Sequence, residues 1–326
     1  MHCDWRRKRE LVSRILPFVA VLAGGQTGIM ADDLPSYQQV SGLQGTVSSI
    51  GSDTLNSLMA HWSGAFRQIY PDVQFQIEGS GSSTAAPAIE RGTAQLGPIS
   101  RKMKSEEEEA FARKRGFKPT CLSVALDCVA VYVHKDNPVR GLTLAQVDSI
   151  FSKTHNSGLP DILNWGDAGL AGPWADVLIT LYGRSPTSGT HAYFKQNALL
   201  KGEYKDTLRE QPGSVAVVQA VASDRSGIGY SGIGYKTPGV RALPLAKTED
   251  YPFIEPTFEN SLVGAYPLGR TLYVYVAKRP GESLPRVNAE FFKFVFSKEG
   301  QDVAVKAGFG ALPHEVLAAQ RKLLDD

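Results

Sequence analysis

Hydrophobic and polar positions along the chain repeat with two different periods, which predicts an α/β fold. Residues 46–50 and 73–77 are rich in β-branched and apolar residues, as strands are. Between them, apolar residues recur at helical spacing until Pro71, and they are Leu55, Leu58, Met59, Trp62, Phe66 and Ile69. The alternation of strand and helix continues beyond this unit, which is typical of α/β proteins.

Further elements follow the same pattern. We expect strands at residues 129–133, 177–182 and 272–277, and helices at residues 84–91, 105–115, 289–296 and 301–306. The helix at 105–115 begins with acidic and ends with basic side chains, which complements its dipole. No Gly/Ser-rich linker divides the chain, so two domains would have to be joined by strands that cross from one to the other.

Residues 1–31 have the pattern of a secretory signal peptide. A basic region that ends at Arg14 precedes an apolar run at 15–23, which is too short to span a bilayer. The whole chain has a formal charge of +2, but a chain that starts at Asp32 has 30 basic and 31 acidic residues. We therefore expect an exported, soluble protein whose positive excess lies in the leader.

Composition narrows the function classes. With 326 residues, 42% hydrophobic and 21% charged, the chain has room for two domains and is neither disordered nor collagenous. Its charge balance lacks the basic excess of a nucleic-acid binder. Cys121 and Cys128 lie in a strand-like stretch, and a disulfide between them would need a sharp bend. The sequence leaves open whether they are joined or are two buried thiols.

Three segments share one design: a β run, then a loop of Gly, Ser and Thr, then a helix. They lie at residues 49–55, 79–84 and 183–190. Backbone N–H groups at a helix N-terminus are unpaired and attract anions, and hydroxyl side chains add donors. Ordinary helix capping is the alternative for each loop alone. Arg184 in the third loop favours an anion site, because a guanidinium can give two parallel charge-assisted hydrogen bonds.

Signatures of enzymes and metal sites are missing. The sequence has no Gly-x-x-x-x-Gly-Lys-Ser/Thr, His-Glu-x-x-His, Cys-x-x-Cys or Gly-x-Ser-x-Gly motif. His191 follows Thr190, but neighbouring helix residues do not face each other. We therefore expect binding without catalysis, a metal or a cofactor. Two alternatives remain: a secreted phosphatase with Ser188, Thr190 or Ser82 as nucleophile, and a surface adhesion or structural protein.

Several longer motifs indicate a family. They include Gly-Ser-Asp-Thr-Leu (51–55), Gly-Ser-Gly-Ser-Ser-Thr (79–84), Leu-Gly-Pro-Ile-Ser-Arg (96–101), Tyr-Gly-Arg-Ser-Pro-Thr-Ser-Gly-Thr (182–190) and Tyr-Pro-Leu-Gly-Arg-Thr-Leu-Tyr-Val-Tyr-Val (266–276). With them, the chain resembles the periplasmic phosphate-binding proteins of bacterial ABC importers, the PstS family of type II solute-binding proteins.

The resemblance implies two Rossmann-like α/β domains joined by two crossing hinge strands. One would hold residues 32–126 and 263–326, the other residues 127–262. It also implies a monomer in the periplasm that captures inorganic phosphate in a cleft between the domains. The cleft would close on the anion, and the protein would deliver it to the membrane permease subunits of an ABC transporter.

Carried onto this chain, the resemblance places Thr54, Leu55 and Ser82 on phosphate from one domain. Arg184, Ser188, Gly189 and Thr190 would bind it from the other.

Two positions depart from the family pattern. Ser100 stands where many members have an Asp that accepts the phosphate proton, and Asp127 is a candidate replacement acceptor. Pro186 stands where an Asp often orients the Arg. These residues bear on the choice of anion. We predict that the chain binds phosphate more tightly than sulfate, and the alternative ligands are sulfate, molybdate and a phosphate ester.

Overall fold

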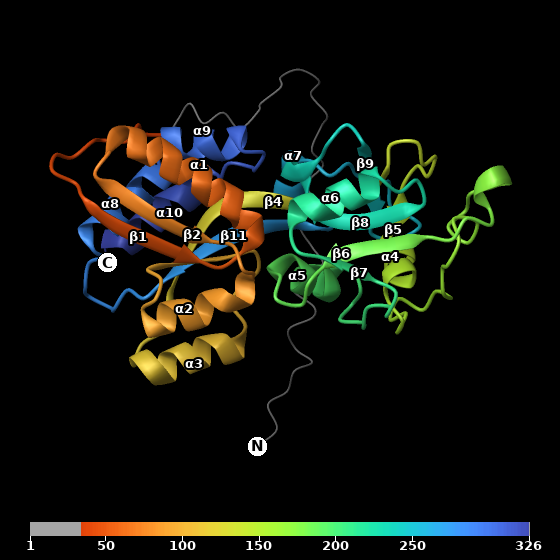
Figure 1. Ribbon diagram of the computed structural model, residues 1–326, viewed down its shortest axis with the longest axis horizontal. Helices are drawn as coiled ribbons and strands as arrows, with labels where there is room; N and C mark the ends of the chain where they lie inside the picture. The colour runs from red at the N-terminus through yellow and green to blue at the C-terminus, as the bar shows by residue number, and fades with distance from the viewer. Residues whose placement is uncertain (1–33, 326) are drawn as a thin grey trace, which may run out of the picture. The chain divides into compact units, whose positions relative to one another are not determined.

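The computed structural model describes residues 34–325, and the predicted signal peptide lies outside them. Nine strands of this part form one mixed sheet in the order β2-β1-β3-β11-β4-β8-β6-β7, with β9 paired to β4 (Figure 1). The sheet confirms the predicted α/β class. No helix among the described residues has the length and apolar character needed to cross a membrane.

The part of the sheet at one end, with the helices on it, is called the first lobe here. Its strands β1, β2 and β3 are parallel, and β11 runs antiparallel to β3. Its strands are β1 (Gly45–Ile50), β2 (Val73–Glu78), β3 (Leu96–Ile99) and β11 (Gly269–Val276). Its helices are α1 (Asp53–Ile69), α2 (Ala85–Arg91), α3 (Ser105–Arg115), α8 (Arg286–Val295), α9 (Lys298–Lys306) and α10 (His314–Asp325), and a 3-10 turn, η3 (Ser82–Thr84), precedes α2.

The other end of the sheet carries the second lobe, where β6 pairs in parallel with both β7 and β8. Its strands are β5 (Leu142–Thr143), β6 (Thr180–Arg184), β7 (Arg209–Gln211), β8 (Gly227–Gly232), β9 (Val240–Leu243) and β10 (Leu245–Ala246), of which β5 and β10 form a separate pair. Its helices are α4 (Leu144–Phe151), α5 (Gly189–Asn197), α6 (Ser214–Ala222) and α7 (Phe258–Leu262), with 3-10 turns η4 (Gly172–Trp174) and η5 (Ile233–Tyr235).

Strand β4 (Thr120–His134) runs through both lobes (Figure 1). Its first part, up to Cys128, pairs with β11, and its last part, from Val129, pairs with β8 and β9. Because Cys121 and Cys128 lie in this one strand, they are held apart, and both thiols are free. Both cysteines are therefore free thiols and not a disulfide, although only Cys128 is buried.

Each lobe has its own hydrophobic core. In the first, the predicted apolar face of α1 is buried against α8 and α9, and Trp62 donates its indole N–H to the Gly300 carbonyl at 2.7 Å. In the second, the rings of Phe194 and Tyr230 stack with their centroids 3.9 Å apart. Two smaller clusters complete the core. One packs α2 and α3 onto the sheet, and the other packs α6 onto it. These cores hold the strand ends, where the candidate site lies.

One predicted strand is displaced. We expect a strand at 177–182, but β6 covers Thr180–Arg184 and Leu178 is 68% exposed. The backbone of Ile179 bonds to Leu163, so this part of the run pairs with a loop instead of the sheet.

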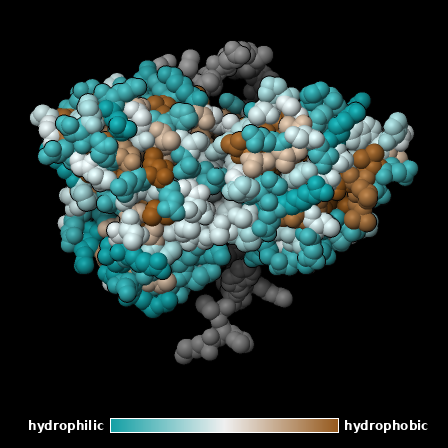
Figure 2. Space-filling view, in the orientation of Figure 1, coloured by the Kyte–Doolittle hydropathy of each residue, from teal (hydrophilic) through white to brown (hydrophobic). Residues whose placement is uncertain are grey.

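Figure 2 shows a mostly hydrophilic face whose largest apolar group lies at its right-hand end, where Figure 1 draws the chain between α4 and β6.

Other boundaries shift by a few residues. Helices α8 and α9 begin three residues earlier than the expected 289 and 301, while α3 covers 105–115 as predicted.

Candidate functional site

The predicted site residues gather where parallel strands of both lobes end. β1 ends just before the loop that leads into α1, β3 ends one residue before Ser100, and β6 ends at Arg184. Ligands of α/β proteins bind at the carboxyl ends of such strands. Within the described part of the chain, all nine predicted residues are buried, although they come from segments more than 100 residues apart.

Arg184 is held by a carboxylate of the first lobe. Its Nη2 lies 2.9 Å from Oδ2 of Asp53, and its Nη1 donates to Ser214 Oγ at 2.8 Å. Ser214 also donates its backbone N–H to Asp53 at 3.0 Å. Burial lowers the pKa of Arg184, and the Asp53 carboxylate opposes this effect. Asp53 thus orients the guanidinium from the other lobe.

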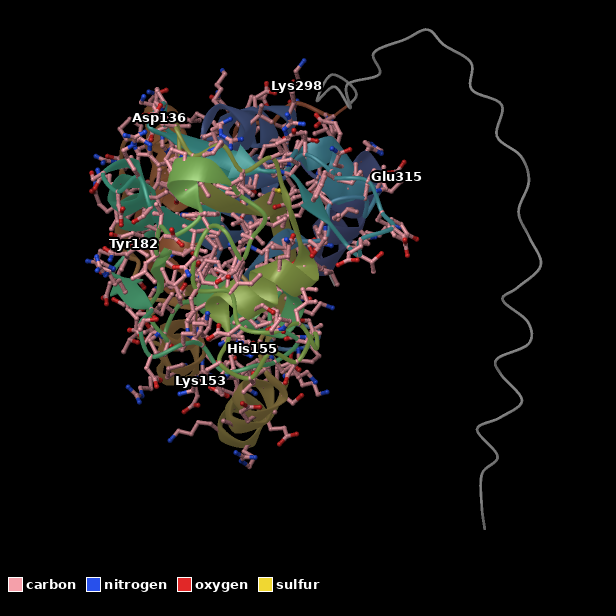
Figure 3. The ribbon with its side chains drawn as sticks, turned by 90° about the vertical axis from the view of Figure 1, so that its right-hand side faces the viewer. Asp136, Lys153, His155, Tyr182, Lys298 and Glu315 are labelled. Carbon is pink, nitrogen blue, oxygen red and sulfur yellow. The ribbon has the colours of Figure 1, made fainter. Side chains whose placement is uncertain are left out.

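Hydrogen bonds of Tyr182 hold β6, the strand that ends at Arg184, in position. Figure 3 labels this residue of β6, whose hydroxyl donates to Asp224 at 3.0 Å and accepts from Arg209 at 3.3 Å. Tyr230 in the adjacent β8 accepts the backbone N–H of Arg184 at 3.3 Å. The end of β6 is therefore anchored on both sides.

Several buried side-chain atoms have no hydrogen-bond partner among the described residues, and two of these donors lie beside the N-terminus of α1. They are Nε of Arg184 and Oγ of Ser52. Ser52 is the N-cap of α1, yet its side chain caps no backbone N–H. An unpaired buried polar group costs about 1–3 kcal/mol, so native proteins rarely leave one without a use. The backbone N–H groups in the first turn of α1, including those of Thr54 and Leu55, follow Ser52 directly and have no partner within the helix.

The loop before α5 meets the first lobe closely. Thr190 Oγ1 lies 2.9 Å from Thr54 Oγ1, and Ser83 donates to the Thr187 carbonyl at 3.2 Å. A Cβ on Gly189 would lie 2.2 Å from Ser82 Oγ and 2.5 Å from Ser100 Oγ. Glycine is required here because no side chain fits between the lobes.

Hydroxyl groups supply donors on both sides. Ser188 Oγ accepts the backbone N–H of Thr190 at 3.1 Å and so caps α5. Ser82 Oγ accepts from the backbone of Ser100 at 3.1 Å and lies 3.2 Å from its hydroxyl. A hydroxyl that accepts in this way keeps its own proton for another acceptor.

A second buried arginine lies beside these residues. Arg270, at the start of β11, donates from Nε and Nη2 to Oδ2 of Asp127 at 2.9 and 2.7 Å. It also donates to the Ser100 carbonyl at 2.9 Å and to Thr190 Oγ1 at 3.0 Å. The other oxygen of Asp127 accepts the backbone N–H of Cys128. Asp127 therefore has a structural partner in addition to its predicted role as an acceptor.

The sequence interpretation missed Arg270, Asp53, Ser52 and Ser214. Asp53 and Arg270 lie within the motifs that carry the family resemblance, so their places in the sequence were visible but their partners were not. Arg184 with Asp53, and Arg270 with Asp127, form two ion pairs whose charges cancel. An anion bound here would depend on directed donors rather than on net charge.

Histidines do not form a catalytic arrangement with the predicted hydroxyls. The ring of His191 packs on Tyr204 with centroids 4.4 Å apart, and its backbone N–H, not its ring, bonds to Ser188. Burial, together with the positive charge of Lys195, lowers the pKa of His191 to about 4. His155 pairs with Asp161 on the loop after α4 (Figure 3). Among residues 34–325, no cluster of His, Cys, Asp and Glu could hold a metal ion.

Comparison with known proteins identifies relatives over nearly the whole chain. A family model described as a PBP superfamily domain matches residues 37–299. The chain is 51% identical over 312 residues to the phosphate-binding protein PstS of Pseudomonas aeruginosa. The aligned residues cover 95% of this chain and 97% of that protein. It is 28% identical over 287 residues to PstS of Staphylococcus epidermidis, covering 87% and 83% of the two chains.

Solved structures have the same fold. A Clostridium perfringens protein, described as a phosphate ABC transporter substrate-binding protein with bound phosphate, matches with a TM-score of 0.70 and 27% identity, covering 82% of this chain and 100% of that one. An ABC-type phosphate transport receptor from Vibrio cholerae matches with a TM-score of 0.63 and 21% identity, covering 82% and 100%. The type II periplasmic binding protein fold that the sequence predicts is confirmed.

Proposed function

We propose that this chain, which belongs to the PstS family of phosphate-binding proteins, captures inorganic phosphate between its two lobes and passes it to an ABC importer. The observation that supports this most is the pair of buried donors without partners, Arg184 Nε and Ser52 Oγ, beside the N-terminus of α1. An oxyanion between them would satisfy both.

We assign the phosphate contacts as follows. The first lobe supplies the backbone N–H groups of Thr54 and Leu55 and the hydroxyls of Ser52, Thr54, Ser82 and Ser100. The second supplies Arg184, the hydroxyls of Ser188 and Thr190, and the Gly189 backbone. Asp127 acts by holding Arg270 against Thr190 and Ser100, and its direct contact with a phosphate proton stays a prediction.

The lobes correspond to the two predicted domains, 32–126 with 263–326, and 127–262. The register of β4 supports this division, because its pairing passes from β11 to β8 between Cys128 and Val129. Closure of these domains around phosphate would be favoured by contacts that need both of them, such as Arg184 with Asp53. The protein is exported to the periplasm, acts as a monomer and docks on the permease subunits of the transporter.

Calorimetric titration tests the proposal. The purified protein should bind phosphate more tightly than sulfate or molybdate, and Arg184→Ala should weaken phosphate binding about 10- to 150-fold, the effect of losing a charged hydrogen-bond donor. Arg113→Ala is the matched control, since its guanidinium is exposed on α3. Sulfate affinity equal to phosphate affinity would contradict the ligand assignment, and an Arg184→Ala affinity equal to that of the control would contradict the site.

A further inference from the structure

A groove of about 1130 Å³ lies beside the candidate site. The first lobe lines it with the segment from Arg101 into α3 and with the start of β11, and the second lobe lines it with α5. Figure 1 draws α3 at the lower edge of the first lobe and α5 to the left of β6 and β7. Because both lobes form its walls, the groove must widen when the lobes separate.

The inner wall of the groove touches the proposed phosphate contacts. Arg270 lies in this wall with its guanidinium 5.3 Å from the ring centroid of Tyr193, whose hydroxyl donates to the Gly269 carbonyl at 2.6 Å. The same guanidinium bonds to Ser100 and Thr190. Arg270 therefore belongs to both the groove wall and the site.

The lining of the groove is cationic. Its charged residues are Arg101, Lys102, Lys104, Lys195, Lys201 and Arg270, with Glu106 as the acidic one. Carboxylates pair with four of these cations, and the pairs are Arg101 with Glu107, Lys104 with Glu106, Lys195 with Glu203 and Arg270 with Asp127. Among residues 34–325, no carboxylate pairs with Lys102 or Lys201, and both are exposed. The groove thus has a local positive excess.

The ion pair of Arg184 lacks the positive excess of the groove. Asp53, whose side chain is 26% exposed, lies against Gly213, where a Cβ would be 3.0 Å from its Oδ1. Because Asp53 pairs with Arg184, a phosphate dianion beside this pair meets no net charge, whereas a dianion in the groove meets two lysines that no carboxylate pairs with among residues 34–325. The chain from Asp32 onward has almost equal numbers of basic and acidic residues, so this difference is one of distribution and not of total charge.

We propose that the groove is the entrance through which phosphate reaches the site, and that Lys102 and Lys201 steer it there. This inference rests on the proposed function. Charges near a cleft raise the rate of association with an oppositely charged ligand and lose their effect in salt. Two charges about 10 Å from a dianion speed association about three- to tenfold at low ionic strength.

Stopped-flow measurement of phosphate association tests the inference. The double variant Lys102→Gln/Lys201→Gln should bind about three- to tenfold more slowly in about 10 mM salt, match the unchanged protein in about 0.5 M salt, and keep its dissociation rate. Lys114→Gln/Lys322→Gln removes the same charge from α3 and α10 outside the groove and should leave both rates unchanged. Lys201 has φ +66°, so Lys201→Asn serves as a second replacement that tolerates this backbone.

Three results would overturn the inference. The first two are an unchanged association rate at low salt and a change in the dissociation rate alone. Equal slowing in the control variant would do the same, because net charge would then account for the effect. Failure of the unchanged protein to bind phosphate at all contradicts the proposed function itself, which separates the two failures.

Discussion

Gly189→Ala adds one methyl group at the point where the two lobes meet. In the structure this carbon would lie 2.2 Å from Ser82 Oγ and 2.5 Å from Ser100 Oγ, both on the first lobe. A Cβ does not approach another heavy atom this closely, so the start of α5 must move away from Ser82 and Ser100. No donor is removed by this change. Weaker binding would therefore report the fit between the lobes.

The expected cost follows from overpacking. Extra methyl groups in well-packed places cost about 1–3 kcal/mol, which corresponds to a loss of about five- to 150-fold in phosphate affinity. Calorimetry on the unchanged protein and on Gly189→Ala gives this ratio. Thermal unfolding in the absence of phosphate shows whether the variant is otherwise intact.

Gly64→Ala is the matched control. Gly64 lies within α1, and a Cβ there would meet nothing within 4 Å. This change should leave affinity unchanged and raise stability by about 0.5–1 kcal/mol, the cost of a helical glycine. Phosphate affinity of Gly189→Ala within twofold of the unchanged protein would refute the close packing of this loop on Ser82 and Ser100.

Two other predictions concern stability. Arg270→Met leaves Asp127 buried without its partner and should lower the free energy of unfolding by about 3–5 kcal/mol in urea denaturation, while Arg270→Met/Asp127→Asn should recover most of it; no recovery would contradict the ion-pair explanation. His191 has its pKa lowered from 6.5 to about 4, so between these pH values the unfolded state binds a proton that the folded state does not, and stability should fall as the pH is lowered through this range. His191→Phe keeps the ring on Tyr204 and should show a shallower fall in melting temperature; equal slopes would be inconsistent with this reasoning.

The fold was largely predictable because its signals are local. The apolar face of α1 and the charged ends of α3 are visible within a single turn or two, and both helices form as expected. The strand at 177–182 was misplaced because β-rich composition does not tell whether a run pairs with the sheet or with a loop. Leu178 shows the difference, since it is apolar and exposed.

The site was predictable in its loops but not in its pairings. Gly/Ser/Thr-rich turns mark the strand ends, and the resemblance to a family identifies Arg184. The partners of Arg184 and Arg270 lie 131 and 143 residues away in the chain, at Asp53 and Asp127. Such contacts depend on the strand order and on the approach of the two lobes, which neither periodicity nor composition encodes.

A crystal structure of the protein grown with phosphate would test the central claim most directly. The account predicts tetrahedral density between the lobes, within hydrogen-bond distance of Arg184 Nε, Ser52 Oγ and the first backbone N–H groups of α1. Phosphate bound elsewhere, with these two donors still without partners, would contradict it.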